Sequence, residues 1–132
     1  MPHLPVPWAR RDIMTAIDRL AVSADAKVLL ARLEGMTVSI GQTIVAVGRQ
    51  ILSFAFEALK MFPNTAFGLV IGAVMAALIG SIAILGGILA PVLGPLLIAC
   101  GIGVGAIADM RNDGLRTRIS AFEANIKVAI DG

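Results

Sequence analysis

The most uniform part of the chain is one apolar stretch, which runs from Ala66 to Ala108 without a charged side chain. Because about 20 helical residues cross a bilayer core, this stretch is long enough for two crossings. Residues 86–95 contain two prolines and three glycines, which weaken helical hydrogen bonding. The pattern therefore predicts a transmembrane helical hairpin over residues 63–109, with a Gly/Pro turn at residues 86–95.

The same stretch has an alternative interpretation as the buried centre of a soluble helical bundle. Helices that are apolar on every side need a complete cover of amphipathic helices, and the rest of the chain supplies about three. That is too few for a monomer, so a soluble form would have to be an oligomer. We favour an integral membrane protein.

Residues 25–62 contain no proline and are predicted to form one long amphipathic helix. Its polar side chains, together with Gly35 and Ala46, recur at steps of three or four and form a narrow strip on an otherwise apolar cylinder. The strip consists of Arg32, Ser39, Gln42, Arg49, Ser53 and Glu57. Two arrangements fit. The helix lies in the membrane interface, or residues 36–56 insert into the membrane with the strip facing a water-filled lumen.

Shorter amphipathic segments are predicted at both ends of the chain. Residues 1–24 combine a proline-rich tail with a short helix from about Trp8 to Val22. Residues 110–132 are predicted to form a helix with one apolar face, made of Leu115, Ile119, Phe122 and Ile126. The expected fold is therefore all-α, with a two-helix transmembrane hairpin between a long N-terminal and a short C-terminal amphipathic helix.

Composition and charge agree with a membrane location. Hydrophobic residues make up 58% of the chain, and the mean hydropathy is +0.89. All lysines and arginines lie outside the apolar stretch, which places both termini on the cytoplasmic side, at the inner membrane if the source is bacterial. The net charge of +2 is too small to indicate a nucleic-acid partner. We expect the lipid bilayer to be the main partner.

Small residues recur along both predicted membrane helices. Four follow one another at four-residue spacing in the first helix, and two more lie in the second. They are Gly68, Gly72, Ala76, Gly80, Gly101 and Gly105. Ridges of this kind let helices approach closely. We interpret them as a packing ridge, used either within one hairpin or between subunits of a homo-oligomer.

The sequence contains no recognisable arrangement of catalytic or metal-binding residues. His3 is the only histidine and Cys100 the only cysteine, and Gly101–Gly105 lacks the GxGxxG spacing of a nucleotide loop. We expect no enzyme activity, no cofactor and no metal. The sequence favours a homo-oligomeric passive pore or membrane-disrupting assembly. The alternative is a non-conducting structural or accessory subunit of a larger membrane complex, or a membrane-shaping hairpin protein.

Overall fold

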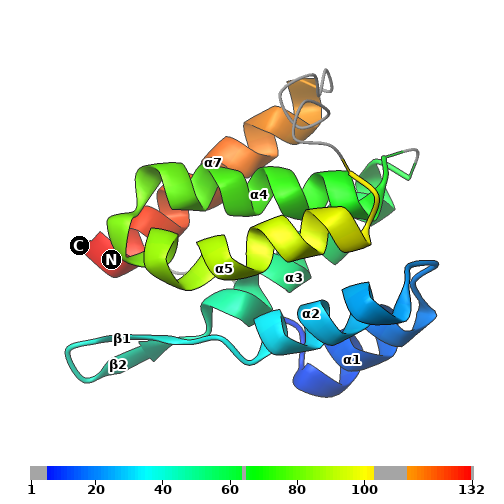
Figure 1. Cartoon of the computed structure of the whole chain (residues 1–132). Helices are drawn as coiled ribbons and strands as arrows, with labels where there is room; N and C mark the ends of the chain where they lie inside the picture. The colour runs from blue at the N-terminus through cyan, green and yellow to red at the C-terminus, as the bar shows by residue number, and fades with distance from the viewer. Residues whose placement is uncertain (1–5, 64, 103–112, 132) are drawn as a thin grey trace.

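The structure is a computed structural model that describes residues 6–63, 65–102 and 113–131. These residues are mostly helical, with one short two-stranded sheet (Figure 1). In chain order the elements are α1 (Arg10–Arg19), α2 (Ala24–Glu34), β1 (Val38–Ile40), β2 (Thr43–Val45), α3 (Val47–Met61), α4 (Phe67–Ser81), α5 (Ala83–Ala99) and α7 (Asp113–Asp131).

The apolar stretch folds into two helices that are short by membrane standards. Helix α4 has 15 residues and α5 has 17, so each is about 22–26 Å long, against a hydrocarbon core of about 30 Å. Within the described ranges, no helix combines the length and the apolarity that a membrane crossing requires. The predicted integral membrane hairpin is therefore wrong. The membrane localisation with cytoplasmic termini and the transmembrane pore, which both depended on it, are wrong with it.

The connection between these two helices also differs from the prediction. The backbone leaves helical geometry at Ile82, with φ −125° and ψ 108°, and residues 86–95 lie inside α5 instead of forming a turn. Pro91 and Pro95 leave the carbonyls four residues earlier, at Gly87 and Pro91, without intrahelical donors. Both of those residues are exposed. Water can therefore bond their carbonyls, and the helix continues through its prolines.

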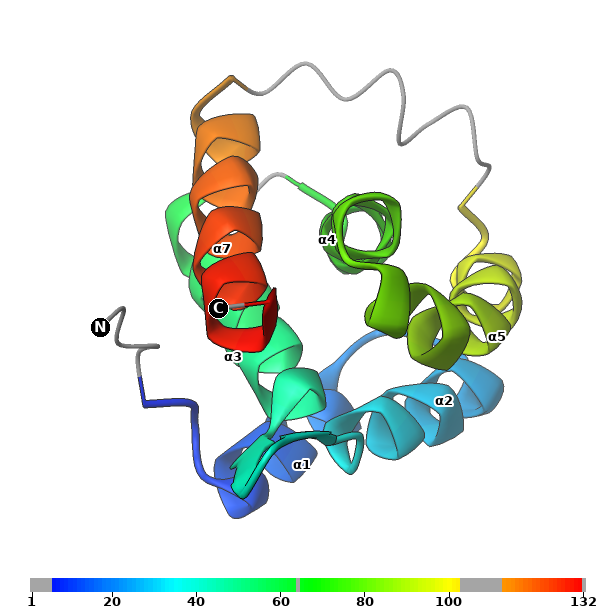
Figure 2. The same cartoon turned by 90° about the vertical axis from the view of Figure 1, so that its left-hand side faces the viewer.

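Helix α4 occupies the centre of the bundle. It packs against α5 on one side and against α3 and α7 on the other (Figure 2). Most of its large side chains are buried, and Ile71, Met75 and Leu78 are fully buried. At its end, Ser81 Oγ donates a 2.6 Å hydrogen bond to Glu123 Oε1 of α7. The apolarity that suggested a membrane helix instead matches the surroundings of a helix buried among the chain's own helices.

The predicted long helix over residues 25–62 is interrupted. Helix α2 begins at the N-cap Ser23, whose Oγ accepts from the Ala26 amide at 3.1 Å, and its C-cap is Gly35. A β-hairpin follows, in which Val38 pairs with Val45 and Ile40 with Thr43. It projects from the helical body (Figure 1). Residues 36–56 are therefore no single helix, and the proposed third membrane segment is excluded.

The hairpin turn explains why the helix breaks. Gly41 has a φ of +60°, and it is the first of the two residues between the paired Ile40 and Thr43. A positive φ at this position alone is typical of a type II′ turn, which matches the twist of the flanking strands. The flanking residues are rich in β-branched side chains, which favour strands over helices.

Amphipathic helices at both ends complete the core. Helix α1 buries Ile13 and Ile17. Helix α7 buries the apolar positions that its spacing indicates, which are Leu115, Ile119, Phe122 and Ile126. These side chains belong to the same buried cluster as α4. One hydrophobic core therefore runs through the described part of the chain.

Candidate functional site

The predicted polar strip does not form one continuous surface. Arg32 lies on α2, Ser39 on β1 and Gln42 in the hairpin turn, and all three are exposed. The structure brings together only Arg49, Ser53 and Glu57, at four-residue steps on one side of α3. These three residues do not line a lumen. Each of them forms a hydrogen bond with Trp8.

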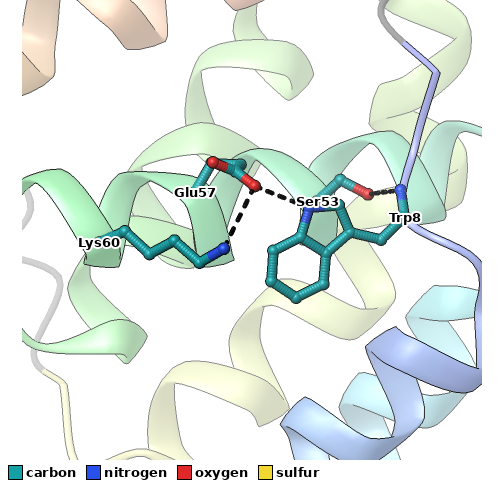
Figure 3. Close-up of polar contacts among 4 residues, drawn as sticks. All are labelled: Trp8, Ser53, Glu57 and Lys60. Atoms are coloured by element: carbon teal, nitrogen blue, oxygen red, sulfur yellow. Dashed lines mark hydrogen bonds and ion pairs between the residues drawn. The ribbon is translucent and has the colours of Figure 1, made fainter.

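Trp8 is held against α3 by three hydrogen bonds. Its backbone amide donates to Ser53 Oγ at 2.8 Å, and its indole Nε1 donates to Glu57 Oε1 at 2.9 Å (Figure 3). The Arg49 guanidinium donates from Nη2 to the Trp8 carbonyl at 3.3 Å. The backbone donor, the backbone acceptor and the indole donor of Trp8 are therefore all satisfied by one helix.

Both aromatic and charged groups hold the indole ring of Trp8. The ring stacks on Phe56 at a centroid distance of 5.5 Å and an interplanar angle of 19°. Lys60 Nζ lies 4.8 Å from the ring centroid and 3.7 Å from Glu57 Oε1 (Figure 3). Phe56 in turn stacks on Phe67 of α4 at 5.0 Å. The segment before α1 is thereby connected through α3 to the central helix. We call this set of contacts the Trp8 clamp.

A cavity of about 340 Å³ adjoins the Trp8 clamp. It lies between the segment before α1, helix α3 and helix α7. Two of its walls are the rings of Phe54 and Phe122, which stack on each other at 4.8 Å. The residues that line it are Val6, Pro7, Trp8, Gln50, Ser53, Phe54, Glu57 and Phe122.

The predicted packing ridge is divided between buried and exposed positions. Gly68 and Gly72 are buried in α4, Ala76 is half-buried, and Gly80 is exposed. A Cβ atom on Gly68 would lie 2.8 Å from Cys100 Cβ, so this glycine serves a close contact within the chain. Gly101, with a φ of +71°, is exposed after α5. Gly105 lies outside the described residues.

Helix α5 carries an exposed surface without a single charged or polar side chain. We call it the α5 outer face; it consists of Ala83, Ile84, Gly87, Ala90, Pro91, Gly94, Pro95 and Ile98. Ile84 is 47% exposed and Ile98 is 81% exposed. A Cβ atom on Gly87 or Gly94 would meet nothing within 4 Å. The steps of three and four between these residues could have revealed the face, but the predicted Gly/Pro turn at residues 86–95 divides them between a turn and two separate helices.

Polar contacts elsewhere serve mainly to join elements. The carboxylate of Glu34 on α2 is 5% exposed and pairs with Arg10 of α1 at 3.4 Å. Burial raises the pKa of the Cys100 thiol. In the described parts of the chain, no group of His, Cys, Asp and Glu side chains is arranged to hold a metal ion. No family model, no curated protein and no solved structure matches this chain, so its function has to be argued from these surfaces.

Proposed function

We propose that this chain is a non-enzymatic structural protein that associates with a second copy of itself through the α5 outer face. The observation that carries this proposal is the exposed, uncharged face along the whole of α5. Contiguous apolar surfaces on a folded protein mark interaction sites, whereas single exposed apolar residues do not. Helix α5 packs mainly on α4 and α2, and the residues on its other side are exposed in the described structure.

The shape of the face fits another helix. Gly87, Ala90 and Gly94 form a shallow centre that allows the backbone of a partner helix to come close. Ile84 and Ile98 stand at the two ends, each seven positions from Pro91. In an antiparallel pair with a two-fold axis near Pro91, Ile84 of one copy would lie opposite Ile98 of the other. This self-complementarity is what a symmetric dimer interface requires.

A lipid surface fits the same face less well. Helices that lie in a membrane interface usually present bulky Trp, Phe and Leu side chains to the acyl chains and basic side chains at the border. The α5 outer face has none of these residues, and most of it consists of Gly, Ala and Pro. We therefore propose a second copy, not a bilayer or a membrane complex, as its partner.

Light scattering coupled to size-exclusion chromatography tests this proposal. The wild-type protein should elute with a multiple of the 13.7 kDa monomer mass. Ile98→Lys should shift it to the monomer, because each copy loses about 1.5–3 kcal/mol of burial and the pair weakens by roughly a hundredfold or more. Ile84→Lys should act in the same way. Val28→Lys is the matched control, since Val28 is an exposed apolar residue on α2.

Three results would overturn the proposal. The first is a wild-type protein that stays monomeric at every concentration tested. The second is an Ile98→Lys variant that keeps the wild-type mass. The third is a wild-type monomer that floats with anionic lipid vesicles and loses this property with Ile98→Lys, because the face would then bind lipid.

A further inference from the structure

The cavity beside the Trp8 clamp is partly open to solvent, because Val6 and Glu57 in its lining are exposed. It has a volume of about 340 Å³. Sites for small organic molecules begin at about 300 Å³. The volume is therefore that of a small ligand of two or three rings.

Three aromatic side chains line the cavity. Trp8 comes from the segment before α1, Phe54 from α3 and Phe122 from α7. Aromatic side chains favour offset stacking on other planar rings. Three rings from three separate parts of the chain thus surround one space that is open to a planar molecule.

The polar groups in the cavity walls already have partners. Ser53 Oγ accepts from the Trp8 amide and donates to the Arg49 carbonyl at 2.6 Å. Glu57 Oε1 accepts from the indole of Trp8 and lies near Lys60 Nζ. Gln50 also has an interaction partner. The Glu57 carboxylate disfavours an anionic ligand and the neighbouring Lys60 ammonium disfavours a cationic one, because like charges repel.

We propose that this cavity is a binding site for a neutral aromatic molecule that packs against Trp8 and the Phe54–Phe122 pair. The Trp8 clamp fixes one wall before the ligand arrives, so little conformational freedom remains to be lost on binding. Water in a cavity with apolar walls has few hydrogen-bond partners and is readily displaced. This site is separate from the α5 outer face and does not depend on self-association.

The neutral dye N-phenyl-1-naphthylamine is a suitable probe, because Trp8 is the only tryptophan and the chain has no tyrosine. Excitation of Trp8 should give saturable, one-to-one energy transfer to the bound dye. Phe54→Leu keeps an apolar side chain but removes a stacking ring, and should weaken dye binding about fivefold. Phe62→Leu is the control, since Phe62 is a partly buried phenylalanine outside the cavity.

The outcomes separate this site from the surface of α5. Dye binding that is unchanged by Phe54→Leu, or that occurs without energy transfer from Trp8, overturns the proposal. So does dye binding that disappears with Ile98→Lys, because the dye would then sit on the α5 outer face. If Phe54→Leu fails to fold, nuclear Overhauser contacts between the dye and the Trp8 indole proton decide the matter in the wild-type protein, and their absence refutes the site.

Discussion

A very close backbone contact lies where α2 meets the start of α3, at Gly48. A Cβ atom on Gly48 would lie 1.7 Å from the Leu33 carbonyl oxygen and 2.8 Å from its carbon. Side-chain motion cannot relieve this contact, because both atoms belong to the backbone. We therefore predict that Gly48→Ala strongly destabilises the protein.

The magnitude follows from the distance. The contact must open by about 1.3 Å to go from 1.7 Å to 3.0 Å, below which Cβ atoms essentially never occur. That shift strains the 3.1 Å hydrogen bond from the Gly48 amide to the Met36 carbonyl and the packing of the fully buried Leu33 and Ile51. Overpacking costs about 1–3 kcal/mol, and a buried donor without a partner costs a similar amount. We expect a loss of about 2–4 kcal/mol in the free energy of unfolding.

Gly35→Ala is the matched control from the same junction. A Cβ atom there would meet only the Arg32 carbonyl, at an ordinary 3.8 Å, and Gly35 already has the right-handed helical φ of −81°. Alanine should therefore be neutral or stabilise by about 0.4–1 kcal/mol, through the lower entropy of the unfolded chain. Urea denaturation followed by circular dichroism measures both variants. A Gly48→Ala protein within 0.5 kcal/mol of wild type would refute the close approach of α2 and α3.

Two further predictions concern polar groups of the core. Arg10→Met leaves the buried Glu34 carboxylate without its ion-pair partner. It should lower the free energy of unfolding by about 1 kcal/mol and no more, since Arg10 itself is exposed. Equal effects of Arg10→Met and the exposed control Arg11→Met in urea denaturation would contradict this prediction. Burial raises the pKa of Cys100 in the folded state, so stability should fall as the pH rises from the ordinary thiol pKa through the folded one. Cys100→Ala should remove that part of the alkaline loss, and identical pH profiles would contradict the prediction.

Periodicity predicted the parts of the fold in which each helix has one clear apolar side. In α7, the spacing of Leu115, Ile119, Phe122 and Ile126 identified the side chains that are buried. On α3, the same reasoning placed Arg49, Ser53 and Glu57 on one side, but not their partner. Trp8 lies 41 to 49 positions earlier in the chain, and no local pattern indicates which distant residue satisfies a polar strip.

The errors have two physical causes. Hydropathy reports how apolar a segment is but not what surrounds it, so a helix buried in protein resembles one buried in lipid. Helix length separates the two, and here it depends on a break at Ile82 that no glycine or proline marks at that position. In the β-hairpin, Ser39 and Gln42 also fit the three- and four-residue steps of a helical strip. The sequence therefore predicted a helix where the structure has two strands.

The number of helices available to cover α4 and α5 explains why the two helices lie in different environments. Two apolar helices need more amphipathic helices around them than this chain provides. Helix α4 receives α3, α7 and α5 as neighbours, and most of its large side chains are buried. Helix α5 packs mainly on α4 and α2, and its other side stays exposed from Ala83 to Ile98. The shortage of cover that argued against a monomer at the level of the sequence thus leaves one whole side of α5 exposed, although single apolar residues such as Val28 and Ile44 are exposed elsewhere. A second copy of the same face removes that shortage for both chains at once, which is why we propose it as the partner.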